Sequence, residues 1–152
     1  MQIIKNKQIV NDTWHYVADN DHLVEGDITV SLPRFQQQKE ELLARTSAIG
    51  VRLHSADPVS LLAADLASLS LIELYFSDFA DGRAFSQAWL LRKRYSFTGE
   101  IRAVGQYCSD QLSYLSRVGV NAFSPLSNED MAISVCKLND FSQHYQTSAD
   151  TL

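Results

Sequence analysis

The side chains best suited to chemistry follow two apolar runs that have the composition of buried strands. The loop and helix start after residues 71–76 carry acids, a guanidinium and neutral hydrogen-bonding groups, at Asp78, Asp81, Arg83, Ser86 and Gln87. A second loop, after residues 100–104, adds Asp110 and Gln111. A guanidinium offers paired donors that match an oxyanion, and the free N–H groups of a helix start add donors that are already oriented. The pattern predicts a corner that recognises a small anion: sulfite, sulfate, phosphate or a partner's carboxylate.

Each of these groups also has an ordinary structural role. Asp78 and Asp81 can cap a helix, and Ser86 or Gln87 can simply face solvent. Arg83 is less expected in a first helical turn, because the helix dipole disfavours cations there. It therefore either binds an anion or pairs with a neighbouring aspartate. His54, alone at a strand end, is more typical of a structural residue than of a general base, and no residue is identified as catalytic.

Three charges fall inside predicted strands rather than at their ends, at Arg52, Glu73 and Arg102. Unpaired buried charges are strongly unfavourable, so these residues either pair with one another or face an open cavity. Partners from loops or from solvent at the sheet edges are an equally good explanation. An Arg–Glu–Arg ladder requires the second, third and fourth core strands to be neighbours. Arg102 joins the candidate binding residues on this ground.

The elements that must position these groups are βα units. Predicted core strands begin near Ile28, Gly50, Leu71, Glu100 and Val120, and successive starts are separated by roughly 20 to 29 residues, the length of one such unit. This spacing predicts an α/β domain with a mainly parallel five-stranded sheet. A flavodoxin-like strand order is favoured, and the alternative is a sequentially ordered half (βα)8 barrel. In either case, ligands are expected beyond the carboxyl ends of the strands.

The N-terminal residues differ from these units. Residues 3–17 alternate loosely around Lys5-Asn6-Lys7, which predicts a β-hairpin. Residues 1–27 are therefore interpreted as a hairpin and linker packed on the core, and residues 28–152 as one α/β domain. Helices are expected at about 35–49, 58–69, 82–95, 108–118 and 127–145.

Composition restricts the partners and cofactors. The 152 residues carry a formal charge of −5, which disfavours binding to nucleic acid or to an anionic membrane. No run approaches the ~20 apolar residues of a membrane span, and the first residues do not resemble a signal peptide, so a cytoplasmic protein is expected. The two cysteines, Cys108 and Cys136, lack metal-ligand spacing. Nucleotide, P-loop and hydrolase motifs are missing, so no cofactor is recognisable, although a flavodoxin-like fold would admit flavin.

The stretch FADGRAFSQAWLLRKRYSFTGEIRAVG, continued by DQLSYLSRVGVNAF, resembles an uncharacterised bacterial family, domain of unknown function 934. The family pattern is similar to DGRxxS, an LLR helix, GE-hydrophobic-RAVG and DQL. The residues that match are Asp81, Gly82, Arg83, Ser86, Leu90, Leu91, Arg92, Arg102, Gly105, Asp110 and Gln111. The family is labelled an oxidoreductase involved in sulfite reduction, so the resemblance implies an accessory or oxidoreductase-like protein with a sulfite or nitrite reductase haemoprotein as partner. A small-anion-binding enzyme and a receiver-like interaction domain remain as alternatives.

Overall fold

The computed structural model describes residues 2–78, 82–124 and 131–139. The strands are β1 (Gln2–Lys5), β2 (Gln8–Asn11), β3 (His15–Tyr16), β4 (Ile28–Ser31), β5 (Ile49–Leu53), β6 (Leu71–Phe76), β7 (Glu100–Gly105) and β8 (Ala122–Phe123). The α-helices are α1 (Leu32–Gln37), α2 (Lys39–Leu43), α3 (Arg83–Trp89) and α4 (Leu112–Arg117). Three 3-10 turns occur at Val59–Leu62, Leu66–Ser68 and Ser109–Gln111, a π-helical turn (Leu90–Arg94) extends α3, and residues 131–139 are helical.

The expected N-terminal hairpin is present. β1 and β2 pair antiparallel, and the two residues between them, Asn6 and Lys7, both have positive φ angles, of 52° and 65°. Two consecutive left-handed residues form the tight turn whose twist matches that of the flanking strands.

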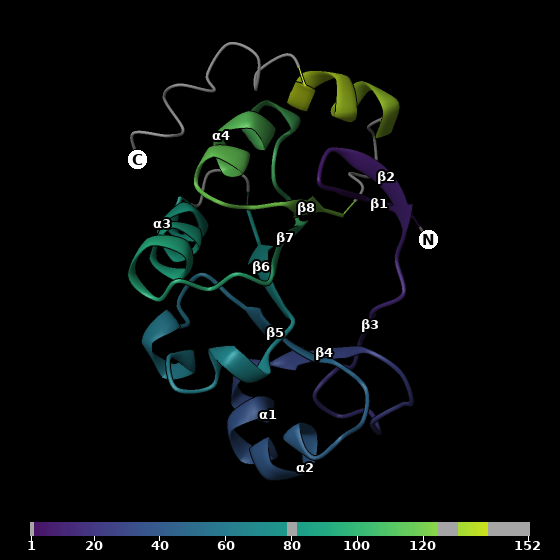
Figure 1. Ribbon diagram of the computed structural model, residues 1–152, viewed down its shortest axis with the longest axis vertical. Coiled ribbons are helices and arrows are strands. Elements are labelled where there is room, and N and C mark those ends of the chain that lie inside the picture. The colour runs from purple at the N-terminus through teal and green to yellow at the C-terminus, as the bar shows by residue number, and fades with distance from the viewer. Residues whose placement is uncertain (1, 79–81, 125–130, 140–152) are drawn as a thin grey trace.

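The sheet has eight strands in the order β2-β1-β8-β7-β6-β5-β4-β3 (Figure 1). From β3 to β8, each strand lies parallel to its neighbour in chain order, and the hairpin joins β8 antiparallel. Because β5 pairs directly with β6, the flavodoxin-like order is wrong. The sequentially ordered half barrel, which was the alternative, fits this mixed α/β sheet.

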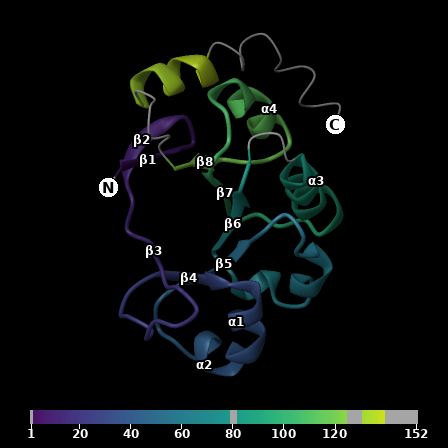
Figure 2. The ribbon, with the colours of Figure 1, turned by 180° about the vertical axis from the view of Figure 1, so that it is seen from behind.

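The two faces of the strands explain why the sheet is curled and not doubly wound. One face is apolar and lies under the helices, with Val51, Ile72 and Ile101 fully buried in the main core. The opposite face carries polar or charged residues at alternate positions, among them Arg52 and Glu73. A flavodoxin-like sheet has helices and apolar side chains on both faces. Figures 1 and 2 show the helices along the outer side of the curl, with the N-terminal segment on the open side.

The chain itself sets a limit on the width of the opening. β2 and β3 are the two edge strands, yet only residues 12–14 separate them. Four Cα steps of about 3.8 Å each can span at most ~15 Å, whereas a flat eight-stranded sheet would be ~34 Å wide. The sheet must therefore curl until its edges almost meet, and the segment between β2 and β3 crosses the open side.

Several helices are shorter than the sequence indicates. The helix expected at 35–49 is divided into α1 and α2 at Gln38, and α1 begins after Ser31, whose side chain accepts from the backbone N–H of Arg34 at 3.3 Å. The apolar segment at 58–69 forms two 3-10 turns that bury Val59, Leu62 and Leu66. The last helix is described only over 131–139, and the rest of its expected range lies outside the described residues.

Arg92 fixes the end of α3 against two later segments. Its guanidinium donates to the carbonyl oxygens of Phe97 (2.7 Å), Gly99 (2.8 Å) and Gly119 (2.9 Å). Burial lowers the pKa of Arg92. Gly119 has a φ of +113°, and a Cβ there would collide with the Arg92 side chain, so only glycine fits. The arginine of the LLR motif thus has a structural role.

Candidate functional site

The register of the parallel strands places three charged residues side by side on the inner face of the curl. Arg52 lies opposite Glu73, and Glu73 lies opposite Arg102. Arg52 Nε lies 3.1 Å from Glu73 Oε1, so the first half of the expected ladder is formed. Arg102 instead pairs with Glu100 and Asp12, so these charges of the described residues form two separate clusters.

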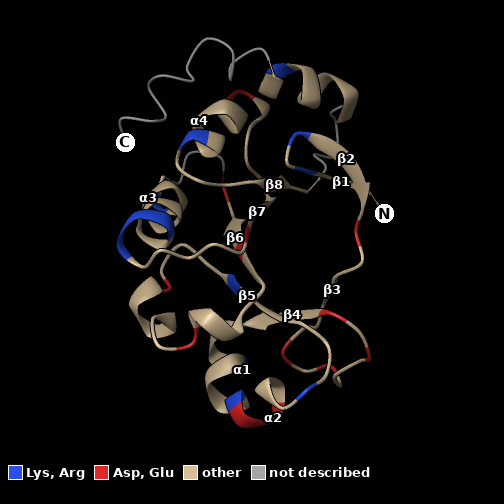
Figure 3. Ribbon diagram, in the orientation of Figure 1, with Lys and Arg blue, Asp and Glu red and all other residues tan. Residues whose placement is uncertain are grey.

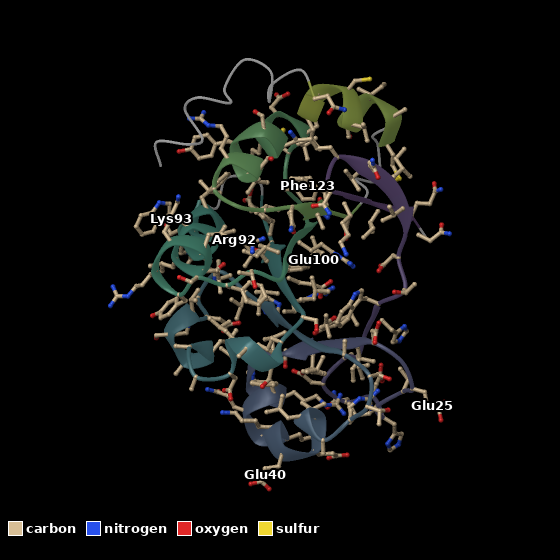
Figure 4. All side chains as sticks on the ribbon, viewed as in Figure 1. Glu25, Glu40, Arg92, Lys93, Glu100 and Phe123 are labelled. Carbon is tan, nitrogen blue, oxygen red and sulfur yellow. The ribbon has the colours of Figure 1, made fainter. Side chains whose placement is uncertain are left out.

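The first cluster surrounds Arg102, whose side chain is only 2% exposed. Its Nε and one terminal nitrogen lie 2.9 and 2.6 Å from Glu100 Oε2, and the other terminal nitrogen lies 3.1 Å from Asp12 Oδ1. Lys5 Nζ lies 3.0 Å from the second carboxylate oxygen of Glu100. Figure 4 shows Glu100 within the curl of the sheet. These residues join β7, the hairpin and the segment that crosses the open side, so the cluster closes the half barrel.

A cavity of about 270 Å³ lies against this cluster. Its lining residues include Lys5, Asp12, Trp14, Glu100 and Arg102. All three guanidinium nitrogens of Arg102 already donate to Glu100 or Asp12. Arg102 therefore has a structural role in this cavity.

The second cluster surrounds Arg52, whose side chain is 18% exposed. Its guanidinium carbon lies 3.7 Å from the ring centre of Tyr16 and 5.6 Å from that of Tyr75. The Tyr75 ring in turn contacts His54, with a centroid distance of 5.1 Å. Burial raises the pKa of the Tyr16 hydroxyl, and the Arg52 guanidinium opposes this shift. Aromatic rings and one carboxylate therefore hold Arg52 in place.

Arg52 differs from Arg102 in the donors that it leaves available. Of the three guanidinium nitrogens of Arg52, Nε is the only one with a hydrogen-bond partner among the described residues. Its two terminal nitrogens are therefore open to a ligand. Arg52 and Tyr75 each stand one residue before the end of their strand, and Tyr16 ends β3. The open donors thus lie toward the carboxyl edge of the sheet, where ligands of parallel α/β proteins bind.

The residues of the predicted corner come from α3, from the loop after β6 and from the turn before α4. Arg83 and Ser86 are exposed on α3, whereas Gln87 is buried and its side-chain nitrogen donates to the carbonyls of His54 (2.9 Å) and Asp57 (3.1 Å). Gln87 therefore joins α3 to the loop after β5. Its side-chain oxygen is buried and has no hydrogen-bond partner within the described part of the chain.

The other candidates lie outside α3. Asp78 and Asp110 are exposed, and Gln111 accepts from the backbone N–H of Cys108 at 2.8 Å, which caps the turn before α4. Asp81 lies outside the described residues. Arg102 is on the inner face of the sheet, where it pairs with Glu100 and Asp12.

Sequence reasoning did not select Tyr16 and Tyr75 for the site. It noted Arg52 only as a charge within a strand. The available signal was the alternation of Arg52 with Val51 and Leu53, which marks one face of β5 as polar.

Two features of the described residues bear on ligands. No three His, Cys, Asp or Glu side chains in residues 2–78, 82–124 and 131–139 come together in a group that could hold a metal ion. Both cysteines are free thiols. In the same ranges, no helix has the length and apolar character needed to cross a membrane.

The comparisons with known proteins give a family and no function. The family model described as "Bacterial protein of unknown function (DUF934)" matches residues 50–152. No curated protein matches the chain. The matched range covers more than half of the chain, and the chain therefore belongs to the DUF934 family.

Proposed function

We propose that this member of the DUF934 family binds a small oxyanion on the inner face of its half barrel, through Arg52, and serves assimilatory sulfite reduction as an accessory or oxidoreductase-like protein. The observation that carries the binding site is that the two terminal nitrogens of Arg52 have no hydrogen-bond partner in the part of the chain that the structure describes. The sulfur context is supported by the resemblance of the motifs between Asp81 and Gln111. Sulfite and sulfate are the first ligands to test, because both present oxygen pairs that fit a guanidinium.

The surroundings of Arg52 favour binding through preorganisation. Glu73 fixes Nε, and the Tyr16 ring covers one face of the guanidinium, so little side-chain freedom is lost when an anion binds. Only 18% of the Arg52 side chain is exposed, and its limited contact with water strengthens a charged hydrogen bond.

The local charge balance limits the affinity. Among the described residues, the cations Lys5, Arg52 and Arg102 stand beside the carboxylates of Asp12, Glu73 and Glu100 on the inner face. The charges of Asp19 and Arg34 also act on Tyr16. An incoming anion therefore gains from directed donors and not from a large positive field. A charged hydrogen bond contributes about 1.5–3 kcal/mol, equivalent to roughly 10- to 150-fold in affinity.

Calorimetric titration with sulfite, sulfate, phosphate and nitrite tests the proposal. In Arg52→Gln, combined with Glu73→Gln so that no carboxylate is left unpaired, we expect the dissociation constant for the preferred anion to rise at least ~10-fold. Glu73→Gln alone should bind at least as tightly as wild type, since the glutamine oxygen can still accept from Nε of Arg52 while the negative charge that repels an anion is removed.

Arg83→Gln is the matched control, because Arg83 is an exposed arginine outside the curl and belongs to the corner that the sequence predicts. If the Arg52 variant binds the anion as tightly as wild type and Arg83→Gln binds it more weakly, the anion site lies on α3 and not at Arg52. Addition of purified sulfite reductase haemoprotein to the wild-type protein then tests the sulfur context separately.

A further inference from the structure

The charges of the chain are unevenly distributed. Residues 82–94 and 111–123, which contain α3, its π-helical extension and α4, carry five basic residues and no acidic one. The remaining residues carry eight basic and 18 acidic side chains. Figure 3 shows basic residues at the end of α3 and on α4, on the outer side of the curl, while acidic residues gather near β3, β4 and α2. One part of the helical layer is thus basic in an otherwise acidic protein.

The same part of the surface exposes large aromatic side chains. Trp89 on α3 is 45% exposed and Tyr114 on α4 is 54% exposed. The two helices pack together there, since the Phe85 and Tyr114 rings meet edge to face with a centroid distance of 5.2 Å. Single exposed apolar side chains are common on monomers, but aromatic side chains grouped on one surface together with arginine are typical of interfaces.

Two cations complete what we call the α3–α4 surface, defined by Trp89, Lys93, Arg94 and Tyr114. Lys93 and Arg94 are both exposed and follow Trp89 by about one turn. Figure 4 shows Lys93 at the outer side of the helix end and Arg92 nearer the middle of the molecule. Arg92 is engaged by three backbone carbonyls, so it does not belong to this surface.

We propose that the α3–α4 surface docks a different protein whose contact region is acidic and has an apolar side at its centre. Trp89 and Tyr114 would be the buried anchors, and Lys93 and Arg94 would steer the partner and fix its orientation. This proposal is independent of the oxyanion site, because Arg52 lies on the inner face of the sheet and the α3–α4 surface lies on the outer helical layer.

Other occupants fit less well. A nucleic acid would extend past the basic region onto the acidic remainder of the molecule, where like charges repel it. A second copy of the protein could place its own acidic region against the α3–α4 surface. Such a contact joins two different faces, so it would build an open filament of many copies unless it closed into a ring. A compact acidic surface on another protein meets only the basic region.

Photo-crosslinking in the bacterial cell that makes the protein identifies the partner. Benzoylphenylalanine replaces Ser86, an exposed residue on α3, and in a control replaces Gln36, an exposed residue on α1. We expect a crosslinked protein from position 86 that is not obtained from position 36. That protein is then purified and titrated calorimetrically with wild type and variants.

The variants decide whether the contact has the proposed chemistry. We expect Lys93→Glu and Arg94→Glu each to raise the dissociation constant about 10-fold, and Trp89→Ser to raise it by ~30-fold or more. Lys7→Glu, with the same charge change in the hairpin turn, should leave it unchanged. All four positions lie at least partly in solvent, so thermal unfolding should stay close to wild type. The absence of a specific product, recovery of nucleic acid or a second copy, or equal affinities of Lys93→Glu and Lys7→Glu would overturn the proposal.

Discussion

Arg102 gives the most direct test of the inner charge network. Arg102→Met removes three hydrogen bonds from a side chain that is 2% exposed. Glu100, which is 8% exposed, then keeps Lys5 as its one cationic partner among the described residues. The Lys5 side chain is 44% exposed, so its interaction is screened by water. Removal of one partner from a buried charge pair costs about 3–5 kcal/mol. In a domain of this size, that loss lowers the melting temperature by roughly 6–20 °C.

Urea unfolding and thermal unfolding measure this loss, and two further variants separate charge from packing. Adding Glu100→Gln to Arg102→Met should restore part of the stability, because the uncompensated carboxylate disappears. Arg34→Met is the matched control: Arg34 also makes three hydrogen bonds through its side chain, but near the surface, to the carbonyls of Ala18 and Asp21 and to Gln38. We expect a loss of only about 1 kcal/mol there.

The reasoning would be refuted by a loss below ~1 kcal/mol in Arg102→Met, or by further destabilisation when Glu100→Gln is added. Limited proteolysis supplies a second readout. Because Asp12 joins the segment across the open side to Arg102, that segment should be cut faster in Arg102→Met than in Arg34→Met.

Two further predictions concern pH and backbone conformation. Burial raises the pKa of Tyr107, whose hydroxyl donates to the Ser124 carbonyl, so the folded protein keeps this proton at a pH where the unfolded chain loses it. The free energy of unfolding should therefore fall above pH ~10, by up to ~1.4 kcal/mol per pH unit. In urea titrations, Tyr107→Phe should show a shallower dependence of this free energy on pH. Equal slopes would contradict this. Gly105 and Gly26 have similar φ angles, of +91° and +94°, but only a Cβ at Gly105 would meet the Phe76 backbone. Gly26→Ala should cost about 1 kcal/mol and Gly105→Ala at least ~2 kcal/mol more, and equal losses by calorimetry would show that crowding is unimportant.

The positions of the strands could be predicted from sequence, but their order could not. Apolar runs and turn residues predict where each core strand begins, and the Lys5-Asn6-Lys7 turn predicts the hairpin. Strand order depends on which faces must be covered, and that information lies in the alternation of polar residues. Arg52, Glu73 and Arg102 all occupy the face opposite the apolar positions, which argues for a single helical layer. Spacing alone does not distinguish a doubly wound sheet from a half barrel.

The candidate site was only partly predictable for a related reason. The carboxyl edge of the strands follows from the βα pattern, and Arg52 is recognisable as a charge that needs a partner. Its stacking on Tyr16 depends on the pairing of β3 with β4, which follows a polar loop without a periodic pattern. For Gln87, the sequence does not reveal the structural contact that its side chain makes. Its position in the helix suggests a ligand contact, but its side chain reaches the loop after β5.

The N-terminal segment explains how a half barrel can keep a charged inner face. In a complete (βα)8 barrel the interior is filled by side chains from all of its strands. Here the opposing side chains come from Lys5 and Asp12, which lie before the range matched by the family model, and they pair with Glu100 and Arg102 inside it. These contacts cover the amino-terminal side of the inner face, while Arg52, one residue before the end of β5, keeps open donors toward the carboxyl side. The charge network thus divides the inner face into a closed structural half and a half available to ligands.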